Sequence, residues 1–202
     1  MNQLVEITER QIGEWDKYKR VNFFNQLSGV RTPFLIGTRS NDEIDNLAIF
    51  NSVVHIGVNP PLLGFVMRPT TVERHTYNNI KGSKVLSMNL VHKGILDKAH
   101  QTSAKYPSEQ SEFEAVGLSV LRGLESVPYV KESNVSLQLG FVEEHKIKNG
   151  TILLVCEIKK VYVNAKYWSD KEDLDFGKMK TVGVSGLYNY YSLESLKRLE
   201  HV

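Results

Sequence analysis

The chain has 202 residues, of which 41% are hydrophobic and 24% charged, with 25 lysines and arginines against 23 aspartates and glutamates. These proportions are typical of globular proteins and exclude an intrinsically disordered chain, which carries fewer apolar residues. The basic residues do not gather into a stripe, so we expect no nucleic-acid partner. Because the length suits one hydrophobic core, we expect a single domain over residues 1–202.

The single cysteine and the lack of long apolar runs bear on the compartment. Cys156 lies in the apolar run Thr151–Ile158, so the chain cannot form an internal disulfide, and we expect a buried structural thiol. No stretch reaches the roughly 18 to 20 apolar residues that cross a bilayer, and the N-terminus carries charges where a signal peptide is apolar. We therefore expect no membrane partner and a cytoplasmic location.

The first half of the chain predicts two elements at the N-terminus and then a series of short strands. We expect a strand at Leu4–Ile7 and a helical segment around Trp15–Phe24. Short β-type runs separated by Asn-Asp, Asn-Pro-Pro and Lys-Gly-Ser turns predict an antiparallel barrel or sandwich. These strands are Phe34–Thr38, Leu47–Phe50 continuing through Val53–Ile56, Leu62–Val66 and Lys84–Val91.

The second half predicts a helical excursion, a long hairpin and a C-terminal helix. Lys93–Ala104 and Ser111–Val116 carry helix-compatible residues. The stretches Val135–Ile147 and Thr151–Val163 are joined by Lys148-Asn149-Gly150, whose Asn-Gly pair is expected to supply the positive φ angles of a tight hairpin. Leucines at helical spacing predict a helix over Ser192–Glu200.

Motifs for hydrolysis, nucleotide phosphates and metals are missing from the sequence. It contains no Gly-x-Ser-x-Gly, no His-Glu-x-x-His and no glycine-rich phosphate loop. The six histidines show no spacing typical of metal ligands, so we expect no metal site. Their positions are His55, His75, His92, His100, His145 and His201.

The densest polar cluster lies in Met67–Ile80, directly after a strand and at the start of a short helix. It combines cations, hydroxyls and helix N-terminal amides, which are the groups that bind a phosphate monoester. They come from Arg68, Thr70, Thr71, Arg74, His75 and Thr76. The alternative is a solvated turn with a helix cap at Thr71 or Thr76.

A second polar segment, Asn46–Ser52, lies about twenty residues earlier. Its backbone groups and amide side chains could face the polar edge of a planar ring. The alternative is an ordinary strand of a barrel in which Asn46 is a turn residue.

Taken in order, six segments resemble the flavin reductase-like, FMN-binding split-barrel family over roughly residues 30 to 165. That family has a strand ending in Thr, then Asn-Leu/Ile-Ala-Pro-Phe/Tyr-Ser, Asn/Asp-Pro-Pro, Lys-Asp-Thr-x-x-Asn-Ile, Val-Asn-Leu and Ser/Asp-Glu-Phe-Glu-x-Ala-Gly-Leu. The corresponding segments here are Ile36-Gly-Thr38, Asn46-Leu-Ala-Ile-Phe-Asn51, Asn59-Pro-Pro-Leu-Leu63, Arg74-His-Thr-Tyr-Asn-Asn-Ile80, Ser87-Met-Asn-Leu90 and Ser111-Glu-Phe-Glu-Ala-Val-Gly-Leu118.

The resemblance implies a mainly β fold with helices, a split β-barrel that binds FMN. Residues matching its ring-binding motif would line the isoalloxazine and ribityl part; these are Thr38, Asn46, Leu47, Ala48, Ile49, Phe50 and Asn51. Arg74, His75 and Thr76 match the phosphate-binding motif. Arg68 lies ahead of that motif and is added on charge grounds alone.

The sequence departs from the family pattern at several positions. Ile49 replaces the usual proline, Asn51 the usual serine, and Arg74-His75 the usual Lys-Asp, which makes the expected phosphate pocket more basic. Short-chain flavin reductases of this kind often carry Gly-Asp-His where this chain has Gly150–Leu154. The sequence is therefore more similar to flavoprotein oxidoreductases of unassigned substrate.

The resemblance implies that FMN receives electrons from NADH, NADPH or another donor and passes them to a small-molecule acceptor. The alternatives are a carrier or sensor module that binds FMN without catalysis, and a split barrel with another ligand such as haem. We identify no catalytic residue. His55, Tyr188 and Tyr190 could tune the flavin or stack on it, although ordinary packing is the alternative for each.

The family also implies a homodimer with the flavin near the interface. The segment Val182–Tyr191 offers aromatic material, and Gly183 and Gly186 permit close backbone approach. The alternative is that these tyrosines close one end of a monomeric barrel.

Overall fold

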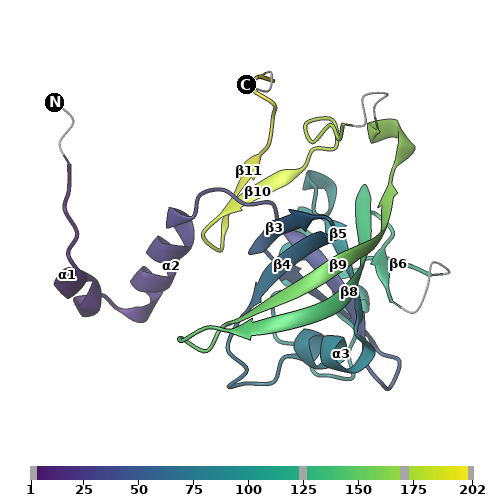
Figure 1. Cartoon of the computed structure of the whole chain (residues 1–202), viewed down its shortest axis with the longest axis horizontal. Coiled ribbons are helices and arrows are strands. Elements are labelled where there is room, and N and C mark those ends of the chain that lie inside the picture. The colour runs from purple at the N-terminus through teal and green to yellow at the C-terminus, as the bar shows by residue number, and fades with distance from the viewer. Residues whose placement is uncertain (1–3, 123–126, 169–172, 200–202) are drawn as a thin grey trace.

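A seven-stranded antiparallel sheet forms the body of the molecule in the computed structural model, which describes residues 4–122, 127–168 and 173–199. The strand order is β2-β1-β5-β8-β9-β4-β3, with β2 and β3 at the two edges. The strands are β1 (Phe34–Arg39), β2 (Asp45–Phe50), β3 (Val53–Val58), β4 (Pro61–Met67), β5 (Val85–Leu90), β8 (Val135–Lys146) and β9 (Ile152–Val163). The sheet curves strongly without closing, and α3 (His75–Ser83) lies at one end of it (Figure 1).

Two hydrophobic cores lie on opposite faces of β1 because successive side chains of a strand point to opposite sides. Ile36 belongs to the larger core, with Phe65 and Leu154 from across the sheet. Leu35 belongs to the other core, which packs β1 and β2 against helices. These helices are α4 (Leu96–Gln101), which follows the short η1 (Lys93–Ile95), and α5 (Glu112–Val116). The strands predicted between Phe34 and Val163, and the helices in Lys93–Ala104 and Ser111–Val116, are confirmed with small changes in bounds.

The predicted long hairpin is present as β8 and β9. Gly150 has a φ of 83°, but Asn149 is not among the residues with positive φ, so the prediction of two such residues was wrong. Asn149 instead accepts hydrogen bonds at Oδ1 from the backbone N–H and the hydroxyl of Thr151. The asparagine therefore stabilises the turn through its side chain.

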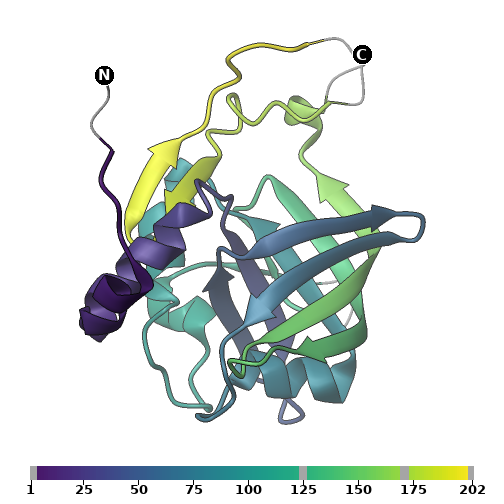
Figure 2. The same cartoon turned by 60° about the vertical axis from the view of Figure 1, so that its left-hand side comes forward.

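The N-terminal prediction was partly wrong. Residues 4–7 form no strand, and two helices follow, α1 (Glu9–Glu14) and α2 (Lys17–Leu27). Asp16 separates them because its carboxylate accepts from the N–H groups of Tyr18 and Lys19 as an N-cap. Neither helix contains a buried residue; α2 lies beside the C-terminal hairpin, and α1 extends farther from the sheet (Figures 1 and 2).

The C-terminal helix is also absent. Residues 182–192 form the hairpin of β10 (Val182–Ser185) and β11 (Asn189–Ser192), and residues 193–199 have no regular structure, while Glu200 lies outside the described residues. The backbone N–H of Leu193 donates to the carbonyl of Thr181, and its side chain lies against Gly183. Tertiary pairing therefore overrides the helical spacing of the leucines.

The remaining elements are short. β6 (Val120–Leu121) pairs with β7 (Tyr129–Val130), and η2 (Ala165–Tyr167) follows β9. Cys156 is fully buried as expected, and burial raises the pKa of its thiol to about 12. Within the described residues, no helix has both the length and the apolar character needed to span a membrane.

Candidate functional site

A buried cluster of hydroxyl and amide side chains joins β1, β2 and α3. Asn46 Nδ2 donates to Thr38 Oγ1 at 3.2 Å and to Thr76 Oγ1 at 3.0 Å. Asn79 Nδ2 donates to the same Thr38 oxygen at 3.1 Å. Thr38, Asn46 and Thr76 are at most 7% exposed. Three of the predicted site residues are therefore brought together, although sequence analysis did not select Asn79, which lies one turn after Thr76 on the same face of the helix.

The N-terminus of α3 lacks a side-chain cap. Its N-cap residue is Arg74, not Thr71 or Thr76, and no side chain accepts from the first N–H groups of the helix. These groups carry partial positive charge and attract anions. The Arg74 side chain contacts the preceding loop, where its Nε donates to the carbonyl of Pro69 at 3.4 Å.

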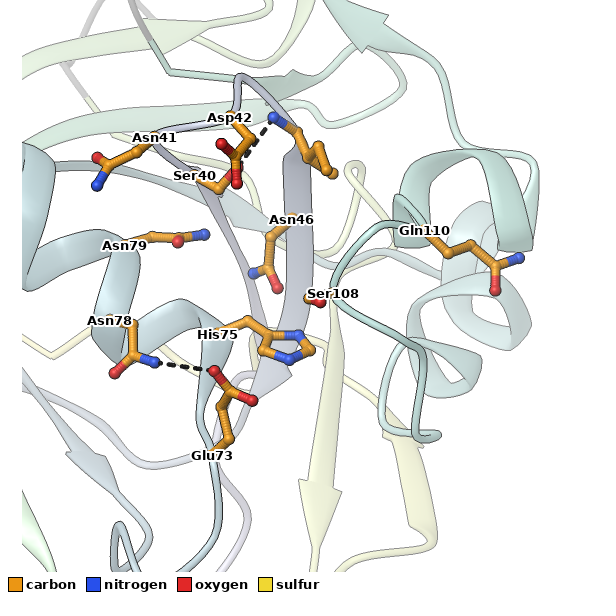
Figure 3. Close-up of a pocket in the computed structure, with 11 residues that line it drawn as sticks. Ser40, Asn41, Asp42, Asn46, Glu73, His75, Asn78, Asn79, Ser108 and Gln110 are labelled. Atoms are coloured by element: carbon orange, nitrogen blue, oxygen red, sulfur yellow. Dashed lines mark hydrogen bonds between the residues drawn. The ribbon is translucent and has the colours of Figure 1, made fainter.

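The first cavity opens beside this helix terminus and has a volume of about 220 Å³. Figure 3 shows the amide of Asn79 pointing toward Asn46, with the His75 ring beside Ser108. Two carboxylates also line the space, those of Asp42 and Glu73. The full lining is Ser40, Asn41, Asp42, Ile44, Asn46, Glu73, His75, Asn78, Asn79, Ser108 and Gln110.

The edge of β2 that does not pair with β1 is fixed at Leu47 by the buried carboxylate of Glu112. The N–H of Leu47 donates to Glu112 Oε2 at 2.8 Å, so it is directed away from β1. Because alternate residues of an antiparallel strand direct their backbone groups to the same side, the N–H and C=O of Ile49 also face outward. Burial raises the pKa of Glu112, while the hydrogen bond from Leu47 opposes that rise.

The second cavity lies at the other end of β2 and has a volume of about 230 Å³. Asn51 Nδ2 donates to the carbonyl of Gly186 at 2.9 Å, which ties β2 to the C-terminal hairpin. His100 Nδ1 and the Tyr190 hydroxyl lie 2.8 Å apart. The lining residues are Pro33, Ile49, Asn51, Arg68, His100, Ser103, Val184, Leu187, Tyr188 and Tyr190.

The predicted residues thus divide into groups. Thr38, Asn46 and Thr76 form the buried cluster, His75 lines the first cavity, and Ile49, Asn51 and Arg68 line the second. Arg74 lines neither.

Three other predicted residues lie within the strand packing. Leu47 is buried in the core between sheet and helices, and Ala48 pairs with Ile36 in the register of β1 and β2. The rings of Phe50 and Phe65 meet edge to face at 5.2 Å.

Of the three aromatic candidates, Tyr188 and Tyr190 line the second cavity, whereas His55 is exposed on β3, the opposite sheet edge from β2. Sequence analysis missed Glu112 and His100. Glu112 stood in the Ser111–Leu118 motif, but nothing in the sequence distinguished His100. No group of three potential metal-binding side chains comes together in residues 4–122, 127–168 and 173–199.

Residues 27–176 match the model of a protein family described as flavin reductase like domain. A protein of Aquifex aeolicus with no characterised function is 28% identical over 106 residues. That match covers 51% of this chain and 54% of the other, so the chain spans about half the length of this curated relative.

Solved structures share the whole fold. A protein from Shewanella frigidimarina described as a flavin reductase with a split barrel domain has a TM-score of 0.93 and 36% identity, covering 98% of this chain and 100% of its own. Nitrilotriacetate monooxygenase component B from Bacillus cereus has a TM-score of 0.86 and 16% identity with the same coverage. Flavoredoxin of Desulfovibrio vulgaris has a TM-score of 0.73 and 20% identity, covering 85% of this chain and 91% of its own. The expected split-barrel fold is confirmed.

Proposed function

The chain belongs to the flavin reductase-like domain family, and from that premise we propose that it is an FMN-binding oxidoreductase that passes electrons from a reduced nicotinamide or another donor to a small-molecule acceptor. One observation carries the proposal: the outward-facing edge of β2 runs between the uncapped N-terminus of α3 and the second cavity. A helix terminus suits a phosphate, and a free strand edge suits a planar ring with donors and acceptors on its rim.

The phosphate end of the cofactor would lie at the N-terminus of α3. The Thr76 oxygen already accepts from Asn46, so its own hydrogen is available to donate. The neighbouring backbone N–H groups add further donors. Since Asp42 and Glu73 oppose an anion in the first cavity, we propose that Arg74 leaves the Pro69 carbonyl and pairs with the phosphate.

The ring would lie along β2, from Asn46 toward Ile49. The backbone N–H and C=O of Ile49 face outward and can pair with the polar rim of the ring. Glu112 holds the neighbouring Leu47 N–H and so fixes the position of this edge. When bound, flavin supplies the transfer of two electrons as a hydride at N5; the residues of the chain bind it, orient it and exclude water.

The names of similar proteins support flavin binding but do not identify the electron donor. The Shewanella relative is described as a flavin reductase, and the Desulfovibrio relative is a flavoredoxin. NADH and NADPH are the donors that we propose to test first.

Reduction of bound flavin by nicotinamides tests the proposal. The purified protein is loaded with FMN and, in parallel, with FAD, and each sample is titrated anaerobically with NADH and with NADPH while flavin absorbance is recorded. We expect tight binding of FMN over FAD and full bleaching by one nicotinamide. FMN binding without reduction by either nicotinamide would favour a carrier or sensor, and no flavin binding would contradict the proposal.

A homodimer completes the proposal. The C-terminal hairpin carries exposed tyrosines, Tyr188 at 68% and Tyr191 at 47%, and it borders the second cavity. A two-fold contact through this hairpin would bury the same surface on both subunits. Sedimentation equilibrium of the FMN-loaded protein checks this: a dimer is expected, and a monomer that retains flavin at micromolar concentration would contradict it.

We also propose a cytoplasmic location. The single cysteine, Cys156, is fully buried with a raised thiol pKa, which is compatible with a reducing compartment. Cell fractionation followed by immunoblotting tests this, and recovery of the protein outside the cytoplasmic fraction would contradict it.

A further inference from the structure

The second cavity is assembled from four separate parts of the chain. Asn51 follows β2, Arg68 follows β4, His100 lies on α4, and Tyr190 lies on β11. The bond from Asn51 to the Gly186 carbonyl and the contact between His100 and Tyr190 connect the last of these parts to the others. Asn51, His100 and Tyr190 are therefore held in place before any ligand arrives.

The lining of the second cavity carries positive charge from Arg68. It contains no aspartate or glutamate, whereas the first cavity contains Asp42 and Glu73. The guanidinium of Arg68 makes no hydrogen bond or ion pair with any of the described residues, so its five N–H donors face solvent at the cavity. A cationic group without a carboxylate partner at the rim of a hollow favours an anionic ligand.

His100 adds a further polar group to this lining. Burial raises the pKa of the Tyr190 phenol, so it remains protonated at neutral pH and can donate to His100 Nδ1 at 2.8 Å. An imidazole that accepts at Nδ1 carries its hydrogen on Nε2. Asn51 likewise keeps one N–H after its bond to Gly186.

The volume and lining of the second cavity favour a ligand with one ring. The volume of about 230 Å³ is below the roughly 300 to 1,000 Å³ of pockets for drug-sized molecules. Tyr188 and Tyr190 supply aromatic faces, and Ile49 and Leu187 supply apolar surface. Such walls suit a flat ring better than a flexible or highly polar molecule.

We propose that the second cavity is a binding site for a small planar carboxylate, meaning a single aromatic or conjugated ring with one acid group. Arg68 pairs with the carboxylate, and His100 and Asn51 orient it, while the tyrosines pack on the ring. This site needs no cofactor, although under the proposed function its ligand would lie beside the flavin ring at the Ile49 end of β2.

Calorimetric titration with benzoate, and with uncharged benzyl alcohol as a matched probe, tests the site. Benzoate is expected to bind at least about tenfold more tightly than benzyl alcohol. Arg68→Gln should weaken benzoate binding by about tenfold or more, as loss of one charge-assisted hydrogen bond implies. The exposed Arg10→Gln is the matched control and should leave the affinity unchanged.

A second variant, at Tyr190, tests the orientation of the ligand separately from the charge of Arg68. Tyr190→Phe keeps the ring and removes the hydroxyl that positions His100, so benzoate affinity should fall by about threefold while benzyl alcohol affinity stays the same. Circular dichroism checks that both variants are folded. Equal affinity for the two probes, or an unchanged benzoate affinity in folded Arg68→Gln, would overturn the site.

Repeating the titration with FMN-loaded protein distinguishes this site from the cofactor site. Benzoate binding both with and without FMN is expected. If FMN abolishes benzoate binding, the cavity belongs to the flavin and the proposal is overturned. If benzoate binds and the protein takes up no FMN, the carboxylate site stands and the proposed function fails.

Discussion

The two cavities at the ends of β2 are built in opposite ways. Beside the first, Thr38, Asn46 and Thr76 satisfy one another in a buried cluster that joins three elements. Around the second, Arg68 and Tyr188 are exposed and make no hydrogen bond or ion pair with the part of the chain that the structure describes. The difference indicates that the first region fixes the shape of the site, whereas the second leaves its donors available to a ligand.

Replacement of Asn46 should cause the largest loss of stability, because Asn46 joins Thr38 on β1 to Thr76 on α3. Asn46→Ala removes the donors to Thr38 and Thr76 and leaves a buried space, so we expect a loss of about 2 to 4 kcal/mol in unfolding free energy. Urea denaturation measures it. Asn41→Ala, an exposed asparagine lining the same cavity, is the control and should change stability by less than about 0.5 kcal/mol.

Arg74→Ala should affect binding and not stability, which would separate the two roles within the first region. We expect FMN binding to weaken by about 1.5 to 3 kcal/mol, roughly ten- to a hundredfold in dissociation constant. The unfolding midpoint should hardly move because the bond to the Pro69 carbonyl is long. Flavin fluorescence quenching measures the affinity, and an unchanged value would place the phosphate elsewhere.

A variant of Glu112 tests whether ionisation of the carboxyl group that binds the edge of β2 lowers the stability of the fold. Because burial raises the pKa of the Glu112 carboxyl above its ordinary value of 4.5, ionisation costs stability. The unfolded chain loses its proton first, so this cost is absent below pH 4.5, grows as pH rises toward the folded pKa, and then stays constant.

Glu112→Gln removes that dependence and keeps an acceptor for the Leu47 N–H. The stability of Glu112→Gln relative to wild type should therefore rise with pH above 4.5, by about 1.4 kcal/mol for each unit of pKa shift. Urea titrations at several pH values measure this. Parallel pH profiles would show that the carboxyl carries no such cost.

The smallest loss of stability is expected when the hydrogen bond between Asn51 and Gly186, in the second region, is removed. Asn51→Ala removes one hydrogen bond to the Gly186 carbonyl, at a cost of about 0.5 to 1.5 kcal/mol. Thermal unfolding should show a small decrease in midpoint, and the exposed Asn189→Ala should show none. A loss as large as that of Asn46→Ala would remove the distinction between the two regions.

The contrast between the two regions also explains which site residues could be predicted from the sequence. Thr38 and Asn46 face each other across one strand pair, and Thr76 opens the next helix, so ordered motifs were enough to group them. His100 and Tyr190 are 90 residues apart and meet only because the C-terminal hairpin packs through Val182 into the same core as Leu35 of β1 and Ala99 of α4. Local patterns hold no information on that contact.

The wrong element predictions have a related cause. Leu4–Ile7 is rich in apolar residues like a strand, but no neighbouring strand pairs with it among the described residues. The leucines after Ser192 have helical spacing, but Leu193 gains a backbone bond to Thr181 and packing on Gly183 instead. In both places tertiary pairing, and not local propensity, decides the structure.

The central claim, that a flavin phosphate is held at the N-terminus of α3, is tested most directly by comparing FMN with riboflavin, which lacks the phosphate. Fluorescence quenching titrations of the wild-type protein should give FMN a dissociation constant at least about tenfold lower than that of riboflavin, and Arg74→Ala should reduce that advantage. Equal affinity for FMN and riboflavin in the wild-type protein would contradict the account.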